Sequence, residues 1–231
     1  MIDLYYWPTP NGWKISIALE EMGLAYRIVP INIGRGEQFK PEFLAISPNN
    51  RMPAIVDHDP SGGGKPVSVF ESGAILLYLA AKAGKLLPAD LRVKWATLEW
   101  LMFQMGSIGP LLGQAHHFRV YALEKIDYAI NRYTNEANRL YGVMNKRLGQ
   151  CKYFAGAEYT IADIAIFPWL RSSKNQGIDW GDYPHLKGWF DEVAARPAVQ
   201  RGVEVLAHAR KPITDERARE VLFGAEQYKR H

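Results

Sequence analysis

The sequence predicts an α/β domain followed by a domain built only of helices, and two observations carry that prediction. Up to about residue 83, short runs rich in β-branched and aromatic residues alternate with segments of helical period. Beyond residue 90 the strand signals largely disappear, and apolar residues recur at steps of three and four, most clearly along residues 126–148. Such a change of period indicates a passage from one fold class to another.

The first half of the α/β domain reads as strand, helix and strand. Ile2–Tyr6 is expected to form a strand that stops at Trp7-Pro8, and a second strand is expected over Tyr26–Ile33. Between them, apolar residues repeat at i, i+3, i+4 and i+7 before Gly23, which is typical of a core-facing helix and its end. Strand, helix and strand at this spacing predict a βαβ unit.

Two more strands and a helix complete this domain. Ala54–Val56 and Val67–Phe70 are short β-branched runs separated by Gly, Pro and Asp, so they predict an antiparallel pair. An apolar helix is expected from Gly73 to Ala83. The resulting βαβ-ββα order is the thioredoxin-like layout.

The rest of the chain is expected to form an all-α helical bundle. Gly84–Pro88 breaks the pattern and suits a linker. One apolar stripe begins at Trp95 and is expected to be interrupted from Gly106 onward, before the long helix at 126–148. The predicted divisions are residues 1–83, a linker at 84–90, and residues 91–231.

Composition excludes several classes of function. The net charge of +4 is scattered over 231 residues, so no nucleic-acid partner is expected. No apolar run approaches membrane-spanning length and no leader pattern opens the chain, which predicts a cytoplasmic protein without membrane association. The single cysteine, Cys151, rules out an internal disulfide framework. His116 and His117 point about 100° apart on a helix, so no metal is expected.

The chemistry is expected at the first turn between strand and helix, Thr9-Pro10-Asn11-Gly12. Thr9 suits an N-cap and Pro10 the first helical position, so the turn also reads simply as a well-made helix start. Redox enzymes of this layout carry Cys-x-x-Cys here, because the helix N-terminus lowers a thiol pKa. This turn has no cysteine, so a ligand must supply the thiol. Thr9 Oγ1, or the Asn11 amide and N–H, can donate hydrogen bonds to its thiolate.

A second set of groups suits the rest of such a ligand. Met52-Pro53 begins a strand, and a cis bond there would turn the Met52 N–H and C=O outward, where a peptide binds as an added strand. Ser72 opens a helix whose first N–H groups suit a carboxylate, and Glu71 can pair with an ammonium. One peptide strand, one carboxylate and one amine describe the γ-glutamyl end of glutathione.

Segments in both halves of the chain are similar to glutathione S-transferases, and most of all to the bacterial nu-class-like branch related to a fungal nitrogen-regulatory prion protein. The segments that carry this resemblance are Thr9-Pro10-Asn11-Gly12, Gly36-Glu37-Gln38-Phe39, Ser47-Pro48-Asn49-Asn50, Met52-Pro53-Ala54-Ile55-Val56, Phe70-Glu71-Ser72-Gly73 and Thr160-Ile161-Ala162-Asp163.

The resemblance implies a glutathione transferase that is a weak conjugating enzyme and a good glutathione-dependent disulfide reductase, with room for two glutathiones or one oxidised glutathione. Glutathione is then a bound co-substrate, and the second substrate is a small disulfide or an electrophile. Thr9 and Asn11 are the expected catalytic residues. Tyr5 and Tyr6 rank below them as thiol donors, because strand residues alternate in direction and at least one of the two should face the core.

The resemblance also implies binding residues outside the turn. Gln38 matches a position that contacts the glycyl side of glutathione; the alternative is that it is a solvated loop residue. Arg132 matches a position that contacts glutathione; the alternative is that it forms an ion pair with Glu136. Tyr128 lies four residues before Arg132 and shares its helix face.

Two other functions stay open, and one further partner is implied. The main activity can be conjugation of electrophiles or reduction of hydroperoxides, since these reactions share the bound thiolate. The protein can instead be a non-catalytic glutathione-binding regulator, although no Asn/Gln-rich prion tail is present. The resemblance further implies a homodimer.

Overall fold

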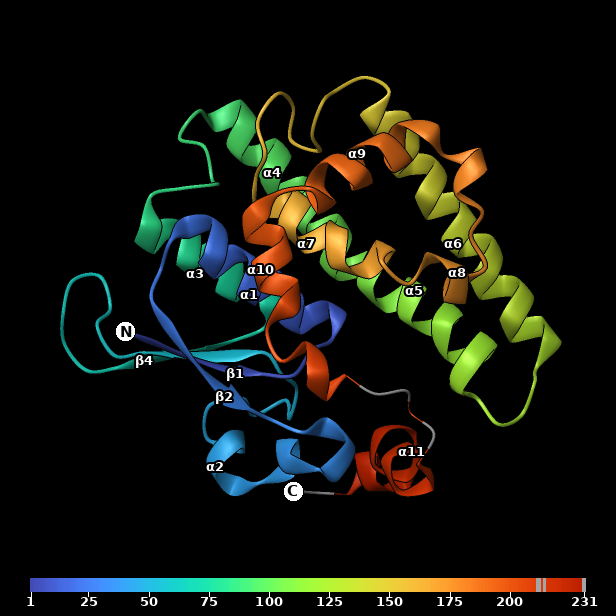
Figure 1. Ribbon diagram of the computed structural model, residues 1–231, viewed down its shortest axis with the longest axis horizontal. Helices are drawn as coiled ribbons and strands as arrows, with labels where there is room; N and C mark the ends of the chain where they lie inside the picture. Colours follow the sequence, from blue (N-terminus) through green and yellow to red (C-terminus); the bar gives the residue numbers. More distant parts are fainter. Residues whose placement is uncertain (211–212, 214, 230–231) are drawn as a thin grey trace. The chain divides into compact units, whose positions relative to one another are not determined.

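The computed structural model describes residues 1–210, 213 and 215–229 (Figure 1). The chain divides into two compact units. The sheet unit consists of residues 1–83 and 201–231, and the helical unit of residues 84–200.

The sheet unit is built on a four-stranded sheet in the order β2-β1-β3-β4. β1 (Ile2–Tyr6) runs parallel to β2 (Tyr26–Pro30). β3 (Ala54–Asp57) is antiparallel both to β1 and to β4 (Val67–Phe70). This arrangement confirms the predicted βαβ-ββα, thioredoxin-like layout.

β2 is shorter than predicted. The strand ends at Pro30, because the Asn32 side chain accepts the Gly34 N–H at 3.1 Å and starts a 3₁₀ turn at Ile33–Arg35. Asparagine commonly competes for local backbone bonds in this way. The expectation of a strand as far as Ile33 was therefore wrong over its last residues.

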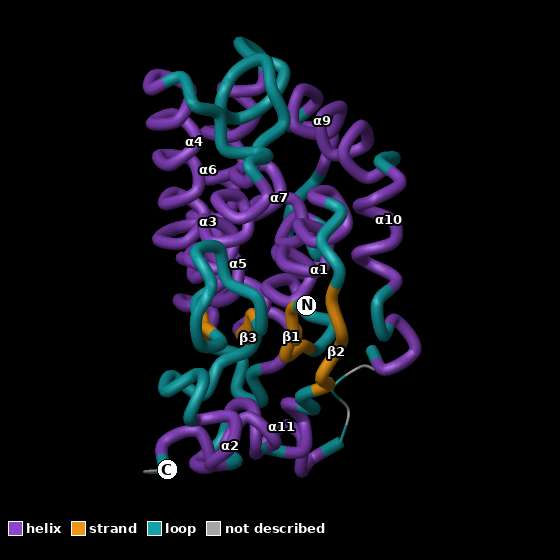
Figure 2. The backbone as a smooth tube through the Cα atoms, turned by 90° about the vertical axis from the view of Figure 1, so that its left-hand side faces the viewer, coloured by secondary structure: helices purple, strands orange, loops and turns teal. Residues whose placement is uncertain are grey.

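The helices of the sheet unit lie on both sides of the sheet. α1 (Pro10–Met22) and α3 (Ser72–Ala83) contact each other on one face, while α2 (Pro41–Leu44) and α11 (Glu216–Phe223) lie on the other (Figures 1 and 2). α1 ends as predicted at Gly23, whose φ of 72° is the left-handed conformation that glycine adopts without strain.

Residues just after 200 contact the sheet unit, although the sequence had assigned them to a helical domain at 91–231. Ser16 Oγ donates to the Gly202 carbonyl at 2.7 Å, and the Tyr6 hydroxyl donates to the Val205 carbonyl at 3.1 Å. A Cβ on Gly202 would lie 2.6 Å from the Ile17 Cα, so the close approach requires glycine. No sequence period reveals such contacts, because they join residues almost 200 positions apart.

The helical unit contains no named strand among its described residues. No helix in the described part of the chain has the length and apolar character needed to cross a bilayer. The α-helices of the helical unit are α4 (Leu91–Phe103), α5 (Gly109–His116), α6 (Asp127–Leu148), α7 (Ile161–Leu170), α8 (Ser173–Gln176) and α9 (Pro184–Ala194). A further helix, α10 (Pro197–Glu204), spans the division between the two units.

The predicted interruption from Gly106 takes the form of a change of helix type, without a loop between two helices. α4 passes into a π-helical turn at Gln104–Ile108 and directly on to α5. Within that turn the Gly109 N–H bonds to the Gln104 carbonyl, five residues back. Pro110 follows where the hydrogen-bond pattern has already changed, so its missing N–H does not break the helix.

Candidate glutathione site

Thr9 is the N-cap of α1 at the end of β1. Its backbone is extended, and its Oγ1 accepts the Gly12 N–H at 3.2 Å. Since the hydroxyl is the acceptor in this cap, its own proton points away from that N–H. Asn11 is the second residue of the same helix and is partly exposed.

The Met52 side chain reaches this turn from the segment before β3. The backbone N–H of Trp7 donates to Met52 Sδ at 3.2 Å, and Thr9 Oγ1 lies 3.9 Å from the same sulfur. The peptide bond between Met52 and Pro53 is cis. A thioether is a weak acceptor, so a thiolate would be a stronger partner for the Thr9 hydroxyl.

Glu71 and Ser72 stand at the start of α3. Glu71 has a φ of 68°, a left-handed conformation that is strained for a residue with a side chain, and its carbonyl accepts the Ile75 N–H at 2.9 Å. Its exposed carboxylate accepts a bond from Asn49 Nδ2 at 3.3 Å. Ser72 beside it is buried, so the pair presents one exposed anion next to one enclosed hydroxyl.

Lys14 belongs to this cluster, and the sequence reasoning missed it. Its side chain lies inside the sheet unit, and its Nζ donates to Ser72 Oγ at 3.1 Å. Burial lowers the pKa of Lys14 to about 7, and the negative charge of Glu71 opposes that shift. A signal was present, because residues 13–19 are apolar except for Lys14 and Ser16, a pattern typical of a helix buried on every side.

Gln38 lies in a 3₁₀ turn at Glu37–Phe39 and is 2% exposed. The alternative of a solvated loop glutamine is therefore wrong. Its Oε1 is buried and has no hydrogen-bond partner among the described residues. Leaving a buried acceptor unpaired costs about 1–3 kcal/mol, so the Gln38 Oε1 has an unused capacity to accept a hydrogen bond.

Tyr5 and Tyr6 differ in burial, as strand alternation predicts. Tyr6 is fully buried, its hydroxyl donates to the Val205 carbonyl, and burial raises its pKa. Tyr5 is partly buried, and its ring centroid lies 6.1 Å from that of Phe43. The Tyr6 hydroxyl is thus engaged in a structural bond and does not donate at the turn.

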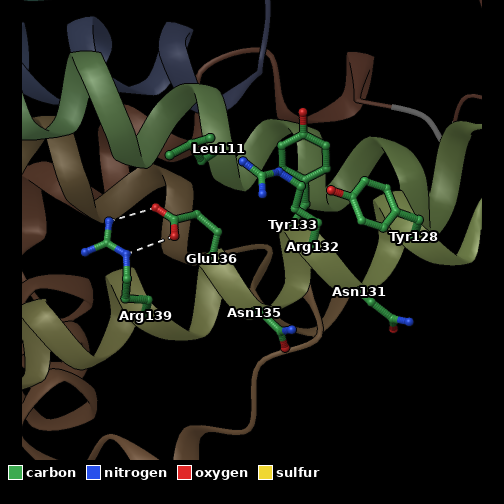
Figure 3. Close-up of a pocket in the computed structure, with 8 residues that line it drawn as sticks. All are labelled: Leu111, Tyr128, Asn131, Arg132, Tyr133, Asn135, Glu136 and Arg139. Atoms are coloured by element: carbon green, nitrogen blue, oxygen red, sulfur yellow. Dashed lines mark hydrogen bonds and ion pairs between the residues drawn. The ribbon is translucent and has the colours of Figure 1, made fainter.

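The helical unit carries an open pocket along the first half of α6, with a volume of about 770 Å³ (Figure 3). Tyr128 and Arg132 line it together, and both are exposed. Arg139 holds Glu136 through two bonds, from Nε at 2.9 Å and from Nη2 at 2.7 Å. Among the described residues no ion pair joins Arg132 to a carboxylate, so the expected alternative of an Arg132–Glu136 pair is not formed.

The predicted site residues thus gather at separate places. Thr9 lies beside Met52, and Ser72 adjoins Glu71 and the newly found Lys14. Gln38 lies elsewhere in the sheet unit, while Tyr128 and Arg132 lie in the helical unit. No cluster of three or more His, Cys, Asp or Glu side chains suited to a metal occurs in the part of the chain that the structure describes.

Fold and site together define the class of protein. Residues 1–81 match the family model of the glutathione S-transferase N-terminal domain, and residues 123–197 match the model of its C-terminal domain. The chain belongs to the glutathione S-transferase family.

Two curated relatives come from Escherichia coli strain K12. Disulfide-bond oxidoreductase YfcG is 54% identical over 199 residues, which cover 86% of this chain and 93% of the relative. Disulfide-bond oxidoreductase YghU is 45% identical over 214 residues, which cover 87% of this chain and 73% of the relative. The branch expected from the motifs is thereby confirmed.

Solved structures of similar proteins contain glutathione. A family member from Pseudomonas fluorescens, with two glutathiones bound, is 46% identical, with a TM-score of 0.83 over 88% of this chain and 92% of the other. A glutathione transferase from Pseudomonas putida has one glutathione disulfide bound per subunit. It is 42% identical, with a TM-score of 0.85 over 89% of this chain and 91% of the other.

Proposed function

We propose that this protein is a glutathione-dependent disulfide-bond oxidoreductase in which bound glutathione supplies the thiolate. The observation that carries the proposal is the Thr9 hydroxyl: it accepts the helix cap bond, and it donates toward the Met52 thioether sulfur at 3.9 Å, a weak acceptor that a thiolate would surpass. The names of the E. coli relatives and the glutathione in the Pseudomonas structures support the same conclusion.

Each predicted site residue has a role in this proposal. Thr9 and Asn11 donate to the glutathione sulfur, while the Met52 backbone beside Pro53 pairs with the cysteinyl peptide. Glu71 and Ser72 receive the amine and the carboxylate of the γ-glutamyl end. The residues assigned to the remaining contacts are Gln38 on the glycyl side, with Arg132 and Tyr128 from the helical unit.

The reaction balances as two thiol–disulfide exchanges. The bound glutathione thiolate attacks one sulfur of a small disulfide, the S–S bond breaks, and the leaving thiolate takes a proton from solvent. A second glutathione thiolate then attacks the glutathione sulfur of the mixed disulfide, which forms oxidised glutathione and releases the second thiol. Two glutathiones are oxidised for each disulfide reduced, and no protein cysteine takes part.

The test is turnover of 2-hydroxyethyl disulfide with glutathione, alongside an aryl-halide conjugation assay. Thr9→Ala is expected to lower disulfide reduction about a hundredfold and to destabilise the helix start by about 1 kcal/mol. Thr9→Asp separates the two effects, because an aspartate caps a helix but has no hydrogen-bond donor in its ionised side chain: stability should be kept and activity lost. Thr9→Ser should keep both, and Asn11→Ala should lose activity.

Full disulfide reduction by both the Thr9→Asp and the Asn11→Ala variant would contradict the assignment of these two residues as donors to the thiolate. The same assay separates the other candidate functions. Conjugation or hydroperoxide reduction faster than disulfide reduction would make electrophiles or peroxides the main substrates. Tight glutathione binding without turnover would instead identify a regulatory binding protein.

We also infer a homodimer in the cytoplasm. Leu91, Trp95 and Met102 share one face of α4 and are 68%, 63% and 51% exposed. An apolar helix face of this kind suits a symmetric contact with a second copy, and sedimentation equilibrium of wild type and Trp95→Glu tests it. The reaction consumes reduced glutathione, which fits a reducing compartment.

A further inference from the structure

Lys14 is enclosed in the sheet unit directly behind the residue assigned to the γ-glutamyl carboxylate. Its side chain is 1% exposed, it lies between the buried Trp13 and Ile15 on α1, and its Nζ reaches Ser72 Oγ across to the first turn of α3. None of the roles described above explains why a cation is held here.

Burying an ammonium group is unfavourable, so its location calls for a physical reason. The desolvation of Lys14 lowers its pKa to about 7, and the nearby Glu71 carboxylate partly offsets this. An apolar side chain of similar length would fill the same space without that cost. The lysine places a positive charge directly behind the first residue of α3.

We propose that Lys14 is the positioning residue for the γ-glutamyl carboxylate of glutathione, and that it acts through Ser72. A charged amine has only donors, so at 3.1 Å the Ser72 oxygen is its acceptor and the hydroxyl proton is turned away from Lys14. A carboxylate at the start of α3 receives that proton as a hydrogen bond, and the cation behind the hydroxyl strengthens it. The inference rests on the proposed function, which supplies the ligand.

Lys14 and Glu71 together explain how the site selects a free amino-acid end. The γ-glutamyl group carries its ammonium and its carboxylate on one carbon atom. Glu71 offers an exposed anion, while Lys14 supplies a cation from inside the unit through Ser72. Glu71 and Ser72 are consecutive residues, so the negative charge of Glu71 and the positive charge behind Ser72 act on neighbouring positions. This pair of charges matches a small zwitterion and disfavours a ligand that lacks either charge.

The experiment is calorimetric titration with two probes that cannot react. One probe is S-methylglutathione, and the other is the same molecule with its γ-glutamyl carboxylate converted to a carboxamide. Lys14→Met is expected to weaken binding of S-methylglutathione about tenfold to a hundredfold, while binding of the carboxamide stays unchanged. Lys14→Arg should restore the carboxylate preference.

Two further variants separate positioning from a structural role. Lys82→Met is the matched control, because Lys82 also belongs to the sheet unit but pairs with Asp57 at 2.8 Å; its affinity for both probes should equal that of wild type. Lys14→Met combined with Ser72→Ala should weaken binding no more than Ser72→Ala alone, since both changes act on one contact. If Lys14→Met does not fold, Lys14→Gln keeps a donor without charge and should show the same loss.

The outcomes distinguish this inference from the proposed function. If wild type fails to bind S-methylglutathione, the proposed function is wrong. If wild type binds it, but Lys14→Met binds it equally well or loses both probes equally, then Lys14 does not recognise the carboxylate and the inference is overturned.

Discussion

The start of α1 and the first half of α6 both carry predicted ligand residues, but they hold them differently. At α1, Thr9 is fixed by a backbone cap and Ser72 by a buried lysine. At α6, Tyr128 is 75% exposed and Arg132 is exposed, and the ion pair on that surface joins their neighbours Glu136 and Arg139 (Figure 3). The first site is therefore organised before a ligand arrives, whereas the second depends on flexible side chains that a ligand must order.

The largest effect is expected where backbone geometry sets the site. A Cβ on Gly12 would lie 2.2 Å from the Trp7 carbonyl oxygen, which itself accepts the Thr9 N–H at 2.8 Å. Gly12→Ala should therefore open the turn, destabilise the fold by about 1–3 kcal/mol and lower disulfide reduction by about a hundredfold. Activity assays and thermal unfolding measure both effects.

Gly142 in α6 provides the matched control for Gly12. Apart from its chain neighbours and the nearby backbone of its own helix, no described atom lies within 4 Å of a Cβ built there. Gly142→Ala should raise the free energy of unfolding by about 0.5–1 kcal/mol and leave activity unchanged. Equal activity losses in the two variants would remove the contrast between the regions.

A smaller effect is expected from pH, through Lys14. Its pKa is lowered to about 7 by burial, with the Glu71 charge opposing the shift, so the free protein loses this cation as pH rises through 7. If the ligand carboxylate needs the cation, affinity for S-methylglutathione should fall by up to about tenfold per pH unit above 7. The direction follows because a depressed lysine pKa leaves the neutral form in excess at alkaline pH.

Lys14→Arg sharpens this test, because a guanidinium stays charged over the whole range. Its affinity for S-methylglutathione should show only the titration of the ligand itself, which is common to both proteins. A wild-type profile that parallels that of Lys14→Arg would mean that Lys14 does not titrate in the site. Calorimetry at about pH 6, 7 and 8, roughly one unit either side of the Lys14 midpoint near 7, measures the difference.

Patterns in the sequence were sufficient for the features that depend on local physics. The strands, the helix start at Thr9 and the end at Gly23 follow from β-branched runs, capping residues and glycine. Contacts between distant segments gave no such signal. The bond from Lys14 to Ser72 spans 58 positions and that from Tyr6 to Val205 spans 199, so neither leaves a period in the sequence.

Competition between neighbouring charges was equally hard to predict. Arg132 and Glu136 are four residues apart, a spacing that favours an ion pair on a helix. Arg139 takes the same carboxylate in a two-bond arrangement, because the planar guanidinium matches both carboxylate oxygens. The sequence contains both possible pairs, and only side-chain geometry selects between them.

That competition leads to the smallest predicted effect. Arg139→Ala releases Glu136, whose carboxylate can then pair with Arg132 four residues before it, and surface pairs of this kind are worth about 0.3–0.5 kcal/mol. If Arg132 binds glutathione, the KM for glutathione should rise about twofold in Arg139→Ala.

The controls for this prediction vary the competing carboxylate. The combined Glu136→Gln and Arg139→Ala variant removes that carboxylate and should return KM to the wild-type value. Arg132→Ala should raise KM both in the wild-type background and in the combined variant. An increase in KM that persists in the combined variant would mean that Arg139 acts on the ligand directly, which would assign the α6 pocket to a different arginine.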